Sequence, residues 1–284
     1  MGTYASLAGI IIVAQFGGEF MKKQNDHEEL LTGGNVSNVY RSGDTVRREV
    51  KSDNMNIQKL LKHLEKKNFS YAPKFLGVDE KGREILSFIE GVAGHDPLKE
   101  YMCSHNALKE IAKMLRLYHD AVCDFPISDD WERMDNTPNN IEVVCHNDFA
   151  MYNIIFKDKN PVGIIDFDVA APGPRLWDIA YTLYTCVPLS RFFRTETGEV
   201  VNYHTLEHAA HIKYRVKLFF EAYGEAIPED YVDMVLLRLE GLCQYMKRKA
   251  NEGDRAFQKM IHEGHLEHYQ KDIQFIHEHR KEWV

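Results

Sequence analysis

The sequence predicts an α+β protein with two lobes, a small antiparallel β-rich lobe followed by a larger, mainly helical one. Before Leu98, short runs of alternating apolar and polar residues are separated by turns that contain glycine. From Leu98 onward, apolar residues recur mainly at helical spacing. The chain has 284 residues, 44% of them hydrophobic, which exceeds a typical single domain and allows a sizeable core.

The N-terminal lobe is expected to consist of paired strands and one helix. Residues 31–40 are predicted to form two strands joined by a Gly-rich loop, and residues 45–50 alternate as a third strand. A helix with an apolar stripe begins near Asn56. Two further strands are predicted at 74–78 and 84–89. Together these elements predict a small antiparallel sheet.

The C-terminal lobe is expected to be built from amphipathic helices. Residues 107–122, 205–223 and 229–250 place apolar side chains along one helix face. We therefore expect residues 21–90 to form the N-terminal lobe and residues 91–284 to form the C-terminal lobe.

Two polar loops carry the most information about chemistry. Residues 145–153 read C-H-N-D-F-A-M-Y-N, and residues 163–168 read G-I-I-D-F-D after a short turn. Phosphoryl transfer from a metal-bound nucleotide needs a carboxylate to receive the acceptor's hydroxyl proton and oxygen ligands to hold Mg²⁺. Asp148 is the candidate base, and Asn153 and Asp166 are the candidate Mg²⁺ ligands. The order of these residues predicts two loops that converge on one Mg-nucleotide site.

Each of these residues alone has an ordinary structural interpretation. Asp and Asn are common turn residues, and an Asp after a strand often forms a turn or caps a helix. Their joint order is much rarer and favours catalysis. For His146 we favour a structural role, in which the imidazole packs inward and hydrogen-bonds to backbone near Asp166. It would then hold the shape of the loop.

At these loops the chain resembles the aminoglycoside phosphotransferase family, also called the phosphotransferase enzyme family. This family is a branch of the protein-kinase-like fold that modifies small molecules. The resemblance covers about residues 30–190 and includes A-A-P-G-P-R-L-W-D-I-A at 170–180. It implies a two-lobed protein-kinase-like fold, the roles given above to the candidate base and metal ligands, and Asp178 as an anchor for the catalytic loop.

The segment after Asp166 distinguishes two kinds of kinase. Protein kinases place a long activation segment, ended by an A-P-E motif, after the metal-binding aspartate. This sequence has no A-P-E motif, and a compact Pro/Gly turn leads directly to a helical run that starts near Leu176. The short connection favours a compact acceptor over a peptide.

The Gly-rich loop and the hinge are the candidate nucleotide contacts. Gly33 and Gly34 allow close approach of backbone to phosphates, and Ser37 offers a hydroxyl donor. The same Gly-Gly-Asn stretch is also simply a good hairpin turn. The resemblance implies that backbone groups near Phe88 and Ile89 bond the adenine edge, although an edge strand that ends in a glycine turn also explains this segment.

The third strand departs from the pattern of kinase-like folds. Those folds place a phosphate-contacting lysine there, paired with a glutamate on the next helix. This strand offers Arg47 and Arg48, one on each face, and residues 56–58 read Asn-Ile-Gln where the acid is expected. Because a guanidinium can hold phosphate oxygens with two hydrogen bonds, we assign the role to Arg48 or Arg47.

Composition restricts the compartment and the partners. The five cysteines are scattered without C-x-x-C spacing, which predicts reduced thiols in the cytoplasm. A formal net charge of −8 disfavours nucleic-acid binding and mildly suits a cationic acceptor. The apolar run at 8–14 is too short to span a bilayer. Residues 1–20 are expected to be a non-native or mis-started leader, with Met21 as the native start, because Gly-Gly-Glu at 17–19 can be encoded by a purine-rich ribosome-binding sequence.

The C-terminal histidines invite a metal interpretation, which we do not favour. The motif H-E-x-x-H is absent, and the Glu and Lys residues between the histidines predict a solvated helix. The residues concerned are His262, His265, His268, His277 and His279.

The sequence therefore predicts an enzyme that uses ATP or GTP with Mg²⁺ to phosphorylate a hydroxyl of a small molecule. An aminoglycoside-like compound, an amino alcohol or a sugar derivative would fit this class. Two alternatives stay open. The missing activation segment disfavours a protein kinase, and the missing lysine–glutamate pair motivates a nucleotide-binding pseudokinase.

Overall fold

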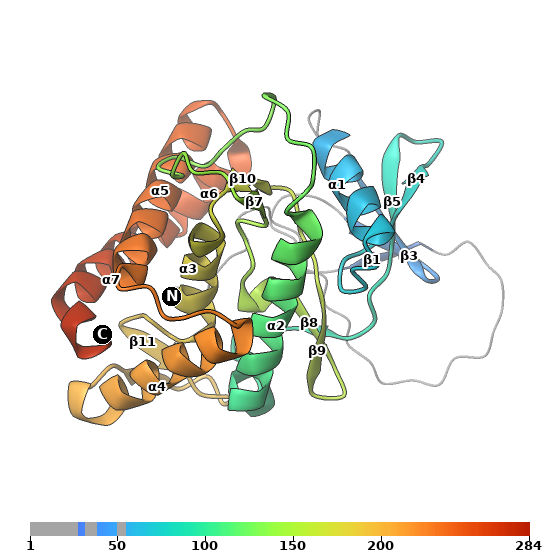
Figure 1. Cartoon of the computed structure of the whole chain (residues 1–284). Coiled ribbons are helices and arrows are strands. Elements are labelled where there is room, and N and C mark those ends of the chain that lie inside the picture. The colour runs from blue at the N-terminus through green and yellow to red at the C-terminus, as the bar shows by residue number, and fades with distance from the viewer. Residues whose placement is uncertain (1–27, 32–38, 50–54) are drawn as a thin grey trace.

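The computed structural model describes residues 28–31, 39–49 and 55–284. The expected leader at 1–20 and the phosphate-loop candidates Gly33, Gly34 and Ser37 lie outside the described residues. Within the described part, a small lobe rich in strands stands beside a larger helical lobe (Figure 1). This arrangement confirms the predicted α+β, two-lobed architecture.

The N-terminal lobe is an antiparallel sheet in the order β1-β2-β3-β5-β4. Its elements are β1 (Glu29–Leu31), β2 (Val39–Ser42), β3 (Thr45–Glu49), α1 (Met55–Lys66), β4 (Phe75–Val78) and β5 (Arg83–Ser87). Val46 is buried in the core together with the apolar stripe of α1. Because side chains two apart on a strand share a face, Arg48 also points inward from β3, whereas Arg47 points to the other face.

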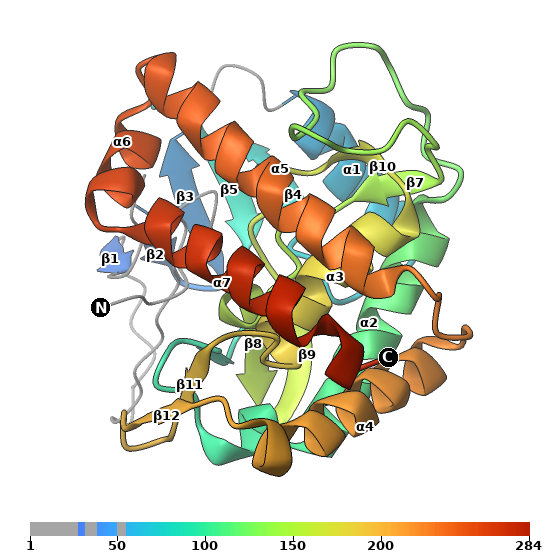
Figure 2. The same ribbon diagram turned by 90° about the vertical axis from the view of Figure 1, so that its left-hand side faces the viewer.

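The C-terminal lobe is a bundle of helices that continues the same hydrophobic core. Its helices are α2 (His105–Val122), α3 (Arg175–Cys186), α4 (Thr205–Tyr223), α5 (Tyr231–Asn251), α6 (Arg255–His262) and α7 (His265–His279). Helix α2 begins after Ser104, whose side chain accepts a hydrogen bond from the N–H of Ala107. Helix α4 ends at Gly224, which has φ of 90°. Helices α5 and α7 cross over α3 on the face shown in Figure 2.

Short strands position the two predicted loops. Strands β6 (Val92–Ala93), β8 (Ile154–Lys157) and β9 (Asn160–Ile164) form one sheet, and β7 (Val143–Cys145) pairs with β10 (Ala171–Gly173). The predicted catalytic loop runs from β7 to β8, and the predicted metal-binding loop runs from β9 to β10. Because β8 pairs with β9 and β7 pairs with β10, both loops are held side by side at both ends. This is the hairpin arrangement that the sequence predicts.

The expectation of solvated C-terminal histidines is wrong for two residues on α7. His265 and His268 are buried, and His268 Nε2 lies 3.3 Å from the Oδ2 atom of Asp272. They are buried because α7 packs against α5 and α6, and Arg191 contacts the same carboxylate. Among the described residues, no group of three or more His, Cys, Asp or Glu side chains has the geometry of a metal site.

The cysteines agree with the reduced state expected from their spacing, since all of them are free thiols in the described part of the chain. The helices at the described positions are too short or too polar to cross a bilayer.

Candidate active site

The catalytic loop is anchored by Asp178 in the first turn of α3. Its Oδ2 atom accepts the N–H of His146 at 2.7 Å, and Oδ1 accepts the N–H of Asn147 at 2.8 Å. Burial alone would raise the pKa of Asp178, but hydrogen bonding and charge from His119 and the N–H of His146 hold the pKa below its usual value. The carboxylate thus stays ionised and fixes the loop, in agreement with the anchoring role that the resemblance implies.

Asp148 and Asn153 are in direct contact. Asn153 Nδ2 donates to Asp148 Oδ2 at 2.8 Å and to the Asp148 carbonyl at 3.0 Å. A short 3₁₀ helix, Met151–Asn153, turns the amide back toward Asp148. The Asn153 Oδ1 atom is buried and has no hydrogen-bond partner among the described residues. Such an oxygen is costly to bury unless something binds it, and an amide oxygen is an ordinary Mg²⁺ ligand, so the residue fits the metal predicted here.

Asp166 lies beside this pair. It follows β9 by two residues and has φ of 69°, a left-handed conformation that Asp tolerates better than most residues. The N–H of the preceding Ile165 donates to the Asn153 carbonyl at 3.0 Å, which ties the metal-binding loop to the catalytic loop. The backbone link next to Asp166 therefore brings the two loops together at the Asp148–Asn153 pair.

A cavity of about 30 Å³ lies between the lobes next to Asp166. Its walls come from both lobes and are mainly apolar, namely Val39, Val46, Pro73, Leu86, Ile89, Ile155 and Ile165, with Arg48 at one side. Of the two hinge candidates, Ile89 lines this cavity. Phe88 does not, because its N–H donates to the Asp44 carbonyl at 2.9 Å and its ring lies 3.9 Å from the guanidinium of Arg41.

Arg48 is the arginine of β3 that reaches the cleft. Its Nε atom donates to Glu84 Oε2 at 2.7 Å, and its Nη1 atom donates to Asp168 Oδ1 at 2.6 Å. Burial by itself would lower the pKa of Arg48, but the charges of Asp168 and Glu84 outweigh it and raise the pKa. Arg47, by contrast, donates to the hydroxyl of Thr45 at 2.6 Å. Arg48 is therefore the better candidate for a phosphate contact.

The acidic partners of Arg48 are residues that sequence reasoning missed. A glutamate was expected on the helix after β3, but Glu84 instead stands directly opposite Arg48 in the β3–β5 register. Gln58 of α1 donates to Glu84 Oε1 at 2.8 Å, so the helix still reaches the ion pair through an amide. Only the strand register places Glu84 there, and a local sequence pattern does not contain that information.

Tyr152 was also missed, although it stands next to Asn153. Its hydroxyl donates to Asp148 Oδ1 at 2.6 Å and lies 3.0 Å from the hydroxyl of Tyr181. Burial raises the pKa of Tyr152 well above its usual value, which keeps the hydroxyl protonated as a donor. The two oxygens of Asp148 are thus held by different neighbours, Tyr152 on one side and Asn153 on the other.

His146 occupies the structural position expected for it. The ring is fully buried, packs 4.5 Å from the ring of Phe167, and accepts the N–H of Asp148 through Nδ1 at 3.3 Å. Burial lowers its pKa to about 4, so the imidazole is neutral at pH 7.

These features define a class of protein. A β-rich lobe joined to a helical lobe, an apolar cavity between them, and paired loops that carry a carboxylate and two candidate metal ligands are the parts of a kinase-like small-molecule phosphotransferase.

Comparison with known proteins leads to the particular family. The sequence model of the phosphotransferase enzyme family matches residues 127–209. The chain is also 33% identical over 203 residues to the trifolitoxin immunity protein of Rhizobium leguminosarum bv. trifolii, an alignment that covers 69% of this chain and 74% of that protein. The chain belongs to the phosphotransferase enzyme family.

Solved structures share the fold at low identity. An aminoglycoside phosphotransferase from Streptomyces rimosus, in complex with ADP and streptomycin, superposes with a TM-score of 0.51 at 17% identity, covering 77% of this chain and 93% of that one. The GDP complex of aminoglycoside 2'-phosphotransferase-IIIa gives 0.55 at 14% identity, with 87% and 92% covered. Ethanolamine kinase from Plasmodium vivax gives 0.54 at 15% identity, with 78% and 76% covered. These similarities confirm the protein-kinase-like fold.

Proposed function

We propose that this chain transfers the γ-phosphoryl group of ATP or GTP, with Mg²⁺, to a hydroxyl of a small molecule. The observation that carries the proposal is the amide of Asn153. Its nitrogen holds Asp148 at 2.8 Å, while its buried oxygen lacks a hydrogen-bond partner among the described residues. One side chain thereby links a base to a metal-ligand position, which is the connection that phosphoryl transfer requires.

In this proposal Asp148 orients the acceptor hydroxyl and receives its proton as the oxygen bonds to the γ-phosphorus and the bond to the leaving nucleoside diphosphate breaks. Asn153 and Asp166 would hold the metal, whose positive charge would stabilise the phosphates. The contacts from Tyr152 and Asn153 fix the orientation of the Asp148 carboxylate before the acceptor arrives.

The N-terminal lobe, residues 21–90, would bind the nucleotide. Gly33, Gly34 and Ser37 are proposed to cover the phosphates, and Arg48 to contact them from the cleft. Arg48 is suited to this role because Glu84 and Asp168 already fix its guanidinium beside the cavity. Backbone groups at Phe88 and Ile89 are the proposed contacts of the nucleobase. Ile89 is the better supported of the two, because it lines the cavity, whereas the N–H of Phe88 already donates to the Asp44 carbonyl.

The C-terminal lobe, residues 91–284, would supply the catalytic loops and the acceptor site. We place the enzyme in the cytoplasm, where its nucleotide substrates are found and where the free thiols stay reduced.

The proposal is tested by incubating the protein with Mg²⁺ and either ATP or GTP against a panel of small hydroxylated compounds. Mass spectrometry should detect a product heavier by one phosphoryl group with the wild type and not with Asp148→Ala. Nucleotide binding without a product across a broad panel would instead support the pseudokinase alternative.

The similarity to the trifolitoxin immunity protein suggests a biological role for this activity. Because that relative is named as an immunity protein against trifolitoxin, we propose that phosphorylation by this chain protects its host from a toxic compound. A host strain in which the chain carries Asp148→Ala should then become more sensitive to the compound, to the same extent as a deletion strain. Equal resistance in the variant and the wild type would rule out protection by phosphoryl transfer.

A further inference from the structure

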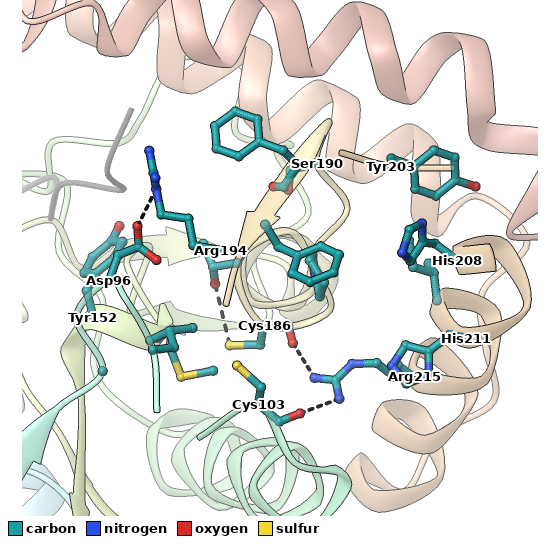
Figure 3. A pocket seen from close by; sticks show the side chains of 18 residues that line it. Asp96, Cys103, Tyr152, Cys186, Ser190, Arg194, Tyr203, His208, His211 and Arg215 are labelled. Carbon is teal, nitrogen blue, oxygen red and sulfur yellow. Dashed lines mark hydrogen bonds and ion pairs between the residues drawn. The ribbon is translucent and has the colours of Figure 1, made fainter. Parts of the chain in front are cut away.

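A second, larger cavity of about 200 Å³ lies within the C-terminal lobe. Figure 3 shows it between the catalytic loop, the end of α3, helix α4 and the hairpin formed by β11 (Phe192–Arg194) and β12 (Val200–Asn202). Tyr152 lines it, and the hydroxyl of Tyr152 donates to Asp148. The wall of this cavity is thus one hydrogen bond from the proposed base, which makes it the natural place for the acceptor.

The size of the cavity restricts what can enter. A cavity of roughly 150 Å³ holds a benzene molecule, so this one accommodates a single six-membered ring with a short substituent at each end. A compound with several sugar rings would extend beyond it.

The walls are mainly apolar. The side chains that form them include Leu98, Met151, Pro188, Phe192, Phe193 and Ile212. Such a lining favours a ligand with an apolar body over one that is polar on every side.

One buried cation faces this cavity, Arg215 of α4. Its Nη1 atom donates to the Cys103 carbonyl at 2.8 Å and its Nη2 atom to the Cys186 carbonyl at 2.7 Å (Figure 3). The Nε atom has no hydrogen-bond partner in the described part of the chain, and the residue is only 4% exposed. Carbonyl groups satisfy donors but do not neutralise a charge, so the guanidinium is buried at a cost that an anion would offset.

The other ionisable groups around the cavity do not supply that anion. Among the described lining residues Asp96 is the one carboxylate, and it forms an ion pair with Arg194 at 3.0 Å. His208 and His211 line the cavity from the same helix as Arg215. The balance of charge is therefore cationic, and a polycationic ligand would meet repulsion there.

We propose that the acceptor is a compact molecule with an apolar body, a hydroxyl group and a carboxylate, and that Arg215 binds the carboxylate. This inference rests on the proposed function, because that function makes the cavity an acceptor site. It departs from the cationic acceptor that the net charge suggests, since net charge sums the whole surface whereas recognition depends on the groups that face the ligand.

The test compares three probes that share a benzene ring with a hydroxymethyl group and differ in the substituent opposite it, which in the neutral probe is a second hydroxymethyl group. They are 4-(hydroxymethyl)benzoate, the neutral 1,4-benzenedimethanol and the cationic 4-(hydroxymethyl)benzylamine. Calorimetric titration of the wild-type protein should give the benzoate a dissociation constant at least about tenfold below that of the amine. Arg215→Gln should abolish this preference, Arg215→Lys should retain part of it, and Arg255→Gln, at an exposed residue outside the cavity, should leave it unchanged.

The wild-type comparison decides the matter even if the Arg215 variants do not fold. Tighter binding of the amine, equal binding of all three probes, or no binding of the benzoate would overturn the inference. A second assay, phosphoryl transfer from ATP to each probe, separates the inference from the proposed function. If the benzoate is preferred but neither the probes nor any compound of the broad panel is phosphorylated, the anion site stands and the proposed function fails. If the amine alone is phosphorylated, the proposed function stands and the inference fails.

Discussion

The hydroxyl of Tyr152 lies 2.6 Å from Asp148 Oδ1 and donates a hydrogen bond to it. Asn153 holds the other carboxylate oxygen, so the orientation of Asp148 is fixed from two sides. A carboxylate held in this way loses little freedom when an acceptor hydroxyl approaches, which lowers the entropic part of the barrier.

A hydrogen bond to a charged group contributes about 1.5–3 kcal/mol. Tyr152→Phe removes this bond from the ground state as well as from the transition state, and only the difference between the two changes kcat. We therefore expect kcat to fall about tenfold. In a plot of kcat/KM against pH, the acid limb should move to higher pH by up to about one unit, because the Asp148 carboxylate loses a hydrogen-bond donor. The matched control is Tyr181→Phe, which removes a hydroxyl that lies 3.0 Å from the hydroxyl of Tyr152. Equal effects of both variants on the pH profile would contradict the positioning role.

Asn153→Ala should raise the Mg²⁺ concentration that gives half-maximal activity at least about tenfold. The variant removes one proposed metal ligand, and Asp166 remains. Titration of activity with Mg²⁺ at saturating nucleotide measures the change. The control is Asn251→Ala, at an exposed residue at the end of α5. An unchanged Mg²⁺ requirement in Asn153→Ala would show that the amide oxygen does not bind the metal.

Arg48 and Arg47 should respond very differently to truncation. Arg48→Met leaves the buried carboxylate of Glu84 without its cation and should cost about 3–5 kcal/mol of unfolding free energy. Arg47→Met should change stability by about 0.5 kcal/mol or less, because its guanidinium hydrogen-bonds to Thr45 and to the Val46 carbonyl of its own strand and not to a buried carboxylate among the described residues. Denaturant unfolding measures both.

The milder variant Arg48→Lys tests the nucleotide contact, because it keeps the charge but loses the fork that binds Glu84 and Asp168 together. It should raise the KM for nucleotide about tenfold with a smaller change in kcat. If Arg47→Lys has this effect instead, the assignment of Arg48 is wrong.

The loops, the hairpin and the helical segments could be predicted because their signals are local in sequence. Asp148 and Asn153 are five positions apart, and the residues that turn the chain between them are part of the motif. The partner of Arg48 depends instead on which residue of β5 stands opposite it, and that register is set by packing of the whole sheet.

The burial of individual polar side chains in the helices could not be predicted from the sequence either. Arg215 lies in a helix with many charged residues and has the appearance of a solvated position, but α4 packs against α2 and encloses it. His268 was misjudged for the same reason on α7. In both cases a long-range contact decides the environment of a residue whose local pattern is ordinary.

Acid should destabilise the fold partly through His146. Burial lowers its pKa from 6.5 to about 4, so between these values the unfolded chain binds a proton that the folded chain does not. The stability that depends on the neutral ring is complete above about pH 6.5 and is lost as the pH falls toward 4, by at most about 3 kcal/mol. Denaturant unfolding from pH 7 to pH 4 measures this loss. The unfolding free energy of His146→Asn should depend less on pH than that of the wild type. His262→Asn, at an exposed residue, should show the pH dependence of the wild type.

The central claim is that Asp148 is the base of a phosphoryl-transfer site whose metal ligands are Asn153 and Asp166. The most direct test is single-turnover transfer from Mg-nucleotide to an acceptor found in the compound screen, with nucleotide affinity measured on the same samples. Asp148→Ala should slow transfer about 10²- to 10⁴-fold, while the dissociation constant for nucleotide should change by less than about threefold. Transfer at nearly the wild-type rate in Asp148→Ala would contradict the role of Asp148 as the base.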